Sequence, residues 1–418
     1  TAAPFALLTT TGLAMDHTRF KKLFNSMTAT FNWLYADSRD IAYIQSGLYP
    51  IRHPQAHPEL PVWGDGNFEW QAESDLPADF FELYGGDAGS GGEPFPSRNR
   101  LVVQDDQGYF EWPGYLPLSA HIQDTNPASG YLANWNNSGA AGWWAADANG
   151  TYGPTHRVNH LSRRLQAFKD SGRKHDLASM IETAADAAYT DLRGLDLLPL
   201  LAQLARSGTL SADQQAALTL LEDWRADGSG QWIDGGDGLG ALRRDRDADG
   251  AYDHRAAVVL MDAWYLRLME TITVQLAELE AQGAPVLTGR FDAPRAQGSA
   301  FQEGWYQHMV RMLNMALQTP GTPQYRALRC AGSSDAQACR SAVLTALDQA
   351  LADLGGLANQ ASWDGSQLTY PKGDCGEVES CDAVEHTSFA YQPVPPIHWI
   401  NRPTFHQAVE VIEDRFVQ

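Results

Sequence analysis

Carboxamide side chains surround a single tryptophan between residues 130 and 138. The segment reads Gly-Tyr-Leu-Ala-Asn-Trp-Asn-Asn-Ser and follows a turn that contains Pro, Ser and Gly. A side-chain amide N–H is a neutral donor that can point at the negative oxygen formed when an acyl carbonyl is attacked. One such donor stabilises the transition state of acyl transfer by roughly 3–4 kcal/mol. Taken alone, however, the segment is more typical of an asparagine-rich turn at the end of a strand.

A second pattern with chemical potential is acidic. Residues 245–253 read Asp-Arg-Asp-Ala-Asp-Gly-Ala-Tyr-Asp, which has the D-x-D-x-D-G start of a calcium loop. Alternating aspartates direct oxygens inward, and Gly250 allows the sharp turn that oxygen coordination needs. The twelfth position holds Ala256 in place of a bidentate Glu, so the loop is not a complete EF-hand. We expect it to bind Ca²⁺, with a solvated acidic loop as the alternative. The candidate ligands are Asp245, Asp247, Asp249 and Asp253.

The four cysteines fall into two short-range pairs, Cys330 with Cys339 and Cys375 with Cys381. Both intervals are loop-like in composition, so two local disulfides are the simplest prediction, and they indicate an oxidising compartment. The alternative is a zinc site with four thiolates. The spacings do not match the usual two-residue zinc knuckles, which argues against it.

The composition is that of an acidic globular protein. Its 418 residues are 44% hydrophobic and include 13 Trp, enough to bury a large core. The net charge of −21 argues against nucleic-acid binding, because phosphate contacts require clustered Lys and Arg. No apolar run approaches the roughly 18 residues of a membrane-spanning helix. The start of the chain lacks a signal-peptide pattern, so we expect Thr1 to follow a processing site or further upstream sequence.

Elements that position these residues can be predicted from periodicity. Asp16 can cap a short helix. Its apolar positions at helical spacing are Phe20, Leu23, Phe24 and Met27. Aromatic and β-branched residues favour strands over 30–49. Residues 50–130 alternate loops with short strands, and a glycine-rich surface loop covers 85–92.

From residue 158 the pattern becomes helical. Further helices are predicted over 175–189, 195–206, 256–279 and 341–354, and one more opens at Ser211. Gln214, three residues after Ser211, completes a capping box. From residue 363 the tail is rich in proline and aromatic residues. We expect it to be extended and to pack on the body of the protein, because free tails do not carry this many apolar residues.

Four ordered blocks carry a family resemblance. They read FNWLYAD, IAYIQSG, YPIR and HPELP over residues 31–37, 41–47, 49–52 and 57–61, and SGYLANWNN follows them. In this order they resemble the penicillin acylase family of N-terminal-nucleophile hydrolases. The resemblance covers residues 1–165 well and continues loosely to residues 395–405.

The resemblance implies an α+β fold, the αββα sandwich of N-terminal-nucleophile hydrolases, with a large helical insertion and an extended C-terminal tail. Residues 1–157 are expected to form part of the αββα catalytic core, residues 158–355 a mainly helical region, and residues 356–418 an extended segment that packs back on the core. It also implies autoproteolytic processing of a precursor. This chain would belong to the larger (β) chain, with a companion small chain and an upstream segment as partners.

The resemblance further implies site residues. The family's nucleophile is the first residue of the larger chain, and its own α-amine is the general base. The aligned blocks place that residue upstream of this chain, with Thr1 as the less favoured alternative. Asn136 matches the oxyanion-hole side chain, and Arg157 matches an arginine that orients Asn136 or a substrate carboxylate. Their alternatives are a structural turn residue and a surface arginine.

Three further positions follow from the resemblance. Phe31 matches a position that lines the acyl pocket, with ordinary core as its alternative. A calcium ion near the core would take the carbonyl of Pro58 and the carboxylate of Asp147. We expect Asn134 and Asn137 to hold their loop through backbone contacts.

These observations predict an amidase or acylase, a hydrolase of linear amide C–N bonds, that is periplasmic or secreted. Its substrate would be a small N-acyl compound, and its acyl-enzyme would form on an N-terminal nucleophile outside this chain. The alternative is a calcium-binding extracellular structural or binding protein on a degenerate acylase scaffold.

Overall fold

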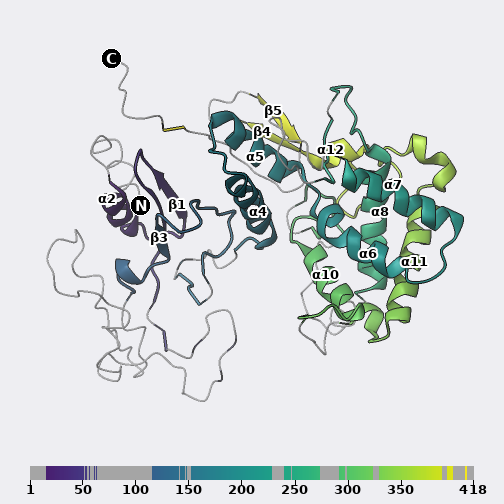
Figure 1. Ribbon diagram of the computed structural model, residues 1–418, viewed down its shortest axis with the longest axis horizontal. Coiled ribbons are helices and arrows are strands. Elements are labelled where there is room, and N and C mark those ends of the chain that lie inside the picture. Colours follow the sequence, from purple (N-terminus) through teal and green to yellow (C-terminus); the bar gives the residue numbers. More distant parts are fainter. Residues whose placement is uncertain are drawn as a thin grey trace. The chain divides into compact units, whose positions relative to one another are not determined.

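The computed structural model describes residues 16–50, 52–53, 56, 61, 63, 115–140, 142–145, 147, 152–227, 240–245, 247–273, 291–296, 299–322, 329–387, 393–398 and 410–411; of 384–387 and 393–398 it describes the backbone only. Internal contacts divide the chain into two compact units (Figure 1). Unit 1 comprises residues 1–158 and 409–418, and unit 2 comprises residues 159–408. Both helices and small sheets are present.

Unit 1 contains a helix on a three-stranded antiparallel sheet. Helix α2 (His17–Asn25) begins after Asp16, whose side chain accepts a hydrogen bond from the backbone N–H of Arg19 (2.8 Å), as predicted. Strands β1 (Asn32–Ala36), β2 (Ile41–Gln45) and β3 (Gln123–Thr125) follow in the order β1-β2-β3. The 3₁₀ turn η3 (Leu118–Ala120) precedes β3. A small core is formed by Phe20, Phe24, Met27 and Ile44.

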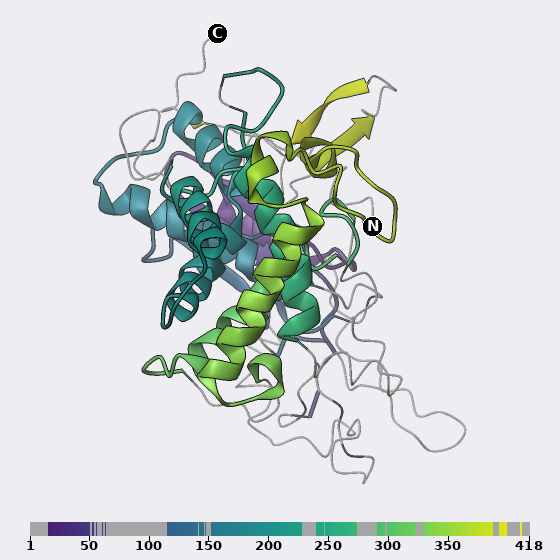
Figure 2. The same cartoon turned by 90° about the vertical axis from the view of Figure 1, so that its right-hand side faces the viewer.

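Unit 2 is mainly helical. Its helices are α4 (His156–Asp170), which begins in unit 1, α5 (Leu177–Tyr189), α6 (Leu198–Ala205), α7 (Ala212–Ala226), α8 (Arg255–Thr271), α10 (Trp305–Ala316), α11 (Ala336–Asp353) and α12 (Val378–Asp382). Short turns are η4 (Arg193–Leu197), η5 (Cys330–Gly332) and η6 (Leu357–Ser362), and an antiparallel hairpin pairs β4 (Ala383–Thr387) with β5 (Pro393–His398). Helix α8 is buried along most of its length and packs against α11 and α7 (Figure 2).

Side-chain caps explain which helix boundaries were predictable. The capping box at the start of α7 is present, with Ser211 Oγ accepting from the Gln214 N–H (3.1 Å) and Gln214 Oε1 from the Ser211 N–H (3.0 Å). The predicted start of α11 at Ser341 is wrong, because Asp335 caps the helix earlier and accepts from the Gln337 N–H. Helix α10 was not predicted, since its N-cap is Gly304 and makes no side-chain hydrogen bond.

Two other predictions need correction. Helix α8 ends at Thr271, not at residue 279, because a β-branched run follows. There the hydroxyls of Thr271 and Thr273 donate to the carbonyls four residues earlier. The C-terminal segment is not wholly extended, since η6, α12 and the β4–β5 hairpin all lie within it.

Both predicted disulfides are present. Cys330–Cys339 joins η5 to α11, with Cα atoms 5.3 Å apart, and Cys375–Cys381 closes the loop into α12, with Cα atoms 5.0 Å apart. No described cysteine is free, which removes the four-thiolate zinc alternative. Among the described residues, no helix combines the length and apolar character that a membrane span requires.

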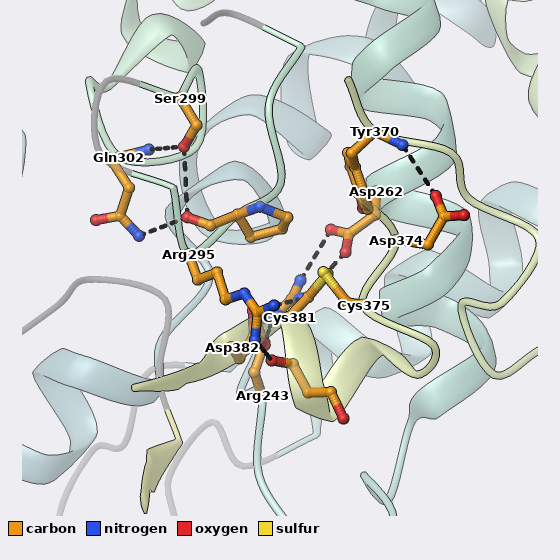
Figure 3. Close-up of a disulfide and its surroundings, with 12 residues drawn as sticks. Arg243, Asp262, Arg295, Ser299, Gln302, Tyr370, Asp374, Cys375, Cys381 and Asp382 are labelled. Carbon is orange, nitrogen blue, oxygen red and sulfur yellow. Dashed lines mark hydrogen bonds and ion pairs between the residues drawn. A yellow bond between two sulfur atoms is a disulfide. The ribbon is translucent and has the colours of Figure 1, made fainter. Parts of the chain in front are cut away.

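A buried ionic cluster lies next to the second disulfide (Figure 3). Its members, all at most 2% exposed, are Asp191, Arg193, Arg243, Asp262 and Asp382. Arg243 donates to both oxygens of Asp262 (2.9 and 3.0 Å) and to both oxygens of Asp382 (2.5 and 3.1 Å). Arg193 donates to both oxygens of Asp191 (2.9 and 2.5 Å) and to one oxygen of Asp262 (2.6 Å). Because Asp382 follows Cys381 directly, α12 is joined to the core of unit 2 through this cluster.

Candidate active site

Residues 134–138, here called the asparagine loop, fix the backbone of Asn136 from both sides. Asn136 has a left-handed backbone (φ 60°), which asparagine tolerates better than most residues. Its N–H donates to Oδ1 of Asn134 (2.9 Å), and its carbonyl accepts from the N–H of Gly153 (2.6 Å). The side chain is exposed and makes no hydrogen bond with any residue that the structure describes. A fixed peptide therefore presents an uncommitted carboxamide.

The two neighbouring asparagines hold the loop, as predicted. Asn137 is buried and accepts the Trp135 N–H at Oδ1 (3.0 Å), while its Nδ2 donates to the Ser138 carbonyl (2.9 Å). The Nδ2 of Asn134 donates to the carbonyl of Asn137 (3.2 Å). Both side chains are thus committed to the backbone, which leaves Asn136 as the carboxamide that can meet a ligand.

Arg157 contacts the same loop from the first turn of α4. Its Nη2 donates to the carbonyl of Trp135 (3.3 Å), and its guanidinium carbon lies 5.7 Å from the centroid of the Trp135 ring. A β-carbon at Gly153 would lie 2.7 Å from that Nη2 and 3.2 Å from the Asn136 carbonyl oxygen, so the glycine leaves room for the guanidinium. The structure therefore brings Asn136 and Arg157 to one place, and a cation lies beside the loop.

His156 precedes Arg157 and is buried. Burial lowers the pKa of the His156 imidazole to about 3, and the positive charge of Arg157 acts in the same direction. The ring is therefore neutral at physiological pH. Of these two residues, only Arg157 carries a positive charge at the start of α4.

Phe31 lies immediately before β1 and is 51% exposed, so it is not an ordinary core residue. Its ring centroid is 6.0 Å from that of Trp33, and its N–H donates to Ser46 Oγ (3.2 Å). The residue before it, Thr30, donates to both oxygens of Asp147, through N–H (2.7 Å) and Oγ1 (2.9 Å). Asp147 therefore anchors the chain that leads to Phe31. Its predicted calcium partner, Pro58, and the alternative nucleophile, Thr1, lie outside the described residues.

A group of neutral polar side chains lies between the sheet and the asparagine loop. Asn32, the first residue of β1, donates through Nδ2 to Asn134 Oδ1 (2.9 Å). Its own Oδ1 accepts from the hydroxyl of Tyr43 (2.5 Å) and from Nε2 of Gln45 (3.0 Å). We did not predict this group from the sequence. The sequence signal that could have indicated it is Asn32 itself, because asparagine is uncommon in strands rich in aromatic residues.

The acidic loop of unit 2 presents three carboxylates to a common point. One oxygen from each of Asp245, Asp247 and Asp249 lies within 4.8 Å of the other two. Gly250 makes the turn with a positive φ of 92° and donates its N–H to Asp245 (2.9 Å), which holds the pKa of that carboxyl below its usual value. Ionised carboxylates around such a turn suit a hard cation. Asp253 is not part of this group, and its N–H closes the loop on the Arg244 carbonyl (3.2 Å).

The chain matches one protein family over most of its length. A sequence model of the family described as penicillin amidase matches residues 2–395. Penicillin G acylase of Escherichia coli is 29% identical over 139 residues, which are 33% of this chain and 12% of that relative. A solved structure, the thermostable penicillin G acylase from Alcaligenes faecalis in orthorhombic form, superposes with a TM-score of 0.54 at 20% identity. That superposition covers 87% of this chain and 53% of the other, so the chain spans about half of that relative, and the likeness is one of fold.

Proposed function

Because the chain belongs to the penicillin amidase family, we propose that it is part of an amidase that hydrolyses a linear amide C–N bond through an acyl-enzyme. The observation that carries this proposal is the clamped backbone of Asn136, whose carboxamide stays exposed beside Arg157. The fixed backbone limits the positions that this carboxamide can take, and a donor held near the developing charge on a carbonyl oxygen stabilises the transition state.

The proposed reaction begins on an N-terminal hydroxyl residue supplied by the precursor outside this chain. Its α-amine takes the hydroxyl proton as the oxygen attacks the amide carbon. The carbonyl electrons move to the oxygen, and Asn136 donates an N–H to that oxyanion together with a backbone N–H from the companion sequence. The C–N bond then breaks, the amine leaves with the proton, and water releases the acyl group by the same steps.

Arg157 and Phe31 would divide the remaining tasks. The guanidinium, held against Trp135, would orient Asn136 or a substrate carboxylate. The half-exposed ring of Phe31 would form part of the wall for the acyl group of a small N-acyl substrate. We also propose the finer fold: the sheet of unit 1 belongs to an αββα core completed by a companion small chain after autoproteolysis.

Two calcium sites and a location complete the proposal. Asp245, Asp247 and Asp249 would hold one Ca²⁺, supported by their shared approach around Gly250. The carbonyl of Pro58 and the carboxylate of Asp147 would hold another. The two disulfides support a periplasmic or secreted enzyme, since reducing compartments disfavour them.

An amide-substrate panel tests the reaction. Aryl-acyl and fatty-acyl amides are incubated with the protein, and the released amine is measured with and without chelator. Asn136→Ala is expected to lower kcat at least about a hundredfold while the protein stays folded. Asn126→Ala is the matched control, because Asn126 has a similar left-handed backbone (φ 50°) and follows β3 outside the loop. Equal turnover in both variants would remove Asn136 from the mechanism.

The calcium proposal has its own measurement. Isothermal titration with CaCl₂ should show a binding event that is lost in Asp247→Asn/Asp249→Asn, which leaves the proposed site at Pro58 and Asp147 intact, whereas Asp223→Asn, on the C-terminal half of α7, should retain both events. Heat signals that are unchanged in the double variant would exclude this loop as a site. A protein that binds Ca²⁺ here but releases no amine from any substrate would fit the alternative of a calcium-binding protein on a degenerate acylase scaffold.

A further inference from the structure

We propose that Asn32 is a positioning residue that joins the sheet of unit 1 to the asparagine loop and thereby orients Asn136. The inference rests on the proposed function, since Asn136 has a catalytic task only in that reaction. Asn32 itself would not touch the substrate. It acts through Asn134, whose single carboxamide oxygen accepts both Asn32 Nδ2 and the backbone N–H of Asn136 at 2.9 Å.

The orientation of the Asn32 amide is determined by its three partners. Its oxygen accepts from the Tyr43 hydroxyl and from Gln45 Nε2, and its nitrogen donates to Asn134. Asn134 Oδ1 also accepts the backbone N–H of Asn136, so the atom of Asn32 that faces it must be a donor. The partners therefore permit one orientation. That orientation delivers an N–H to the loop.

The support behind Asn32 is rigid. Gln45 is fully buried and pairs with Asn32 in the β1–β2 register, and Tyr43 is 9% exposed. Gln45 Oε1 in turn accepts from the hydroxyl of Tyr49 (2.9 Å). Burial raises the pKa of Tyr43 far above physiological pH, so its hydroxyl remains a donor to Asn32. The chain of hydrogen bonds thus starts in packed strands and ends at the backbone of Asn136.

The other end of the Asn134 carboxamide is also held. Asn134 Nδ2 donates to the Asn137 carbonyl, so the carboxamide that links Asn32 to Asn136 is held at both its ends. Every link is neutral. A neutral chain can hold the backbone of Asn136 without placing a carboxylate near the oxyanion, where a negative charge would oppose the reaction.

Asn32→Asp is the sharpest test, because it keeps the shape and replaces the one donor to Asn134 with an oxygen. We expect kcat to fall about tenfold to a hundredfold, with KM changed less than about threefold, since a small misplacement of a catalytic group has effects of this size. Hydrogen–deuterium exchange of the peptide covering residues 134–138 should become faster. Thr28→Asp, which adds the same charge at an exposed position of unit 1, should leave both readouts unchanged.

Two further variants keep the test decisive. If Asn32→Asp does not fold, Asn32→Ser removes the reach to Asn134 without adding charge and should give the same two effects. Tyr43→Phe removes one donor to Asn32 but leaves the hydrogen bond from Asn32 to Asn134 in place. It should lower kcat only a few-fold. Unchanged exchange in a folded Asn32 variant, or faster exchange with unchanged kcat, would overturn the inference.

The experiment separates this inference from the proposed function. All assays use the full protein that carries this chain. A wild-type protein that releases no amine from any substrate would remove the amidase proposal and, with it, the catalytic task of Asn32. Exchange in residues 134–138 would then still show whether Asn32 holds the loop.

Discussion

Each unit contains one extended polar network, and the two differ in charge and in how they end. In unit 1, neutral side chains connect Tyr43 and Gln45 through Asn32 and Asn134 to Asn136, whose carboxamide is exposed. In unit 2, the buried ionic cluster joins two arginines to three aspartates, none of them more than 2% exposed. The first network presents a group to the outside, whereas the second is enclosed and pairs each of its carboxylates with an arginine.

The comparison indicates what each network is for. Burial opposes the charge of Asp191, but the adjacent Arg193 and Arg243 hold the pKa of its carboxyl below the usual value. In a dry interior, removing one partner of such an ion pair costs far more free energy than the pair itself contributes, because a charge is left buried without its partner. Leaving a neutral polar group without a partner costs less free energy than leaving a buried charge without one. We therefore expect stability to depend on unit 2 and catalysis on unit 1.

The largest expected effect is on the ionic cluster. Arg243→Met leaves Asp262 and Asp382 buried with fewer cationic partners, which should lower the free energy of unfolding by roughly 3–5 kcal/mol. Urea denaturation followed by tryptophan fluorescence measures it. Arg206→Met, which breaks the surface pair with Glu222, is the control and should cost less than about 1 kcal/mol. Equal losses in the two variants would show that the cluster is not a special source of stability.

The disulfide next to the cluster should have the next largest effect. Replacing Cys375 and Cys381 with Ser opens a loop with a sequence separation of 6, worth roughly 2 kcal/mol from chain entropy. Replacing Cys330 and Cys339 opens one with a separation of 9, for which the same model gives a similar value. Because α12 also carries Asp382, the variant without Cys375 and Cys381 should lose more free energy of unfolding than the variant without Cys330 and Cys339. Matching losses would mean that α12 keeps its place without its disulfide.

Acid should weaken unit 1 through His156. The folded protein keeps this imidazole neutral, with a pKa of about 3, whereas the unfolded chain takes up a proton below about pH 6.5. Stability is therefore intact above pH 6.5 and falls as the pH drops toward 3, by about 1.4 kcal/mol per pH unit for this residue. Denaturant unfolding from pH 7.5 to 4 should show a shallower loss for His156→Gln. Parallel curves for the two proteins would contradict a neutral buried imidazole.

The smallest stability effect should accompany a clear kinetic one. Gly153→Ala places a methyl group 2.7 Å from Arg157 Nη2 and 3.2 Å from the Asn136 carbonyl oxygen, so it displaces the guanidinium and presses on the asparagine loop. Because the end of an arginine side chain is flexible, we expect the free energy of unfolding to change by less than about 1 kcal/mol. We expect kcat to fall about tenfold. Unchanged kcat would mean that the position of Arg157 beside Trp135 is irrelevant to the reaction.

Local features were predictable from the sequence, and long-range ones were not. The helices after Asp16 and Ser211 could be predicted, because each cap side chain bonds a backbone N–H only three residues later. The commitment of Asn134 and Asn137 to the loop is equally local. Asn32 escaped prediction because its partner Asn134 is 102 residues away.

The ionic cluster was missed for a similar reason. Arg243 meets Asp262 after 19 residues and Asp382 after 139, and no periodicity relates these positions. Helix α10 begins at Gly304, whose conformation carries no side-chain signature. The sequence therefore predicted most helices and strands and the motif around Asn136. The long-range contacts of Asn32 and Arg243 became visible only in the structure.

The distance along the chain between Arg243 and Asp382 has a consequence for biosynthesis. A ribosome adds the intervening 139 residues at about 5–20 per second, so the arginine waits on the order of 10 s for its last partner. During that interval α8 and its neighbours cannot bury their polar groups completely. Chains truncated before residue 382 should therefore be more sensitive to protease than the full chain, because Arg243 then lacks Asp382.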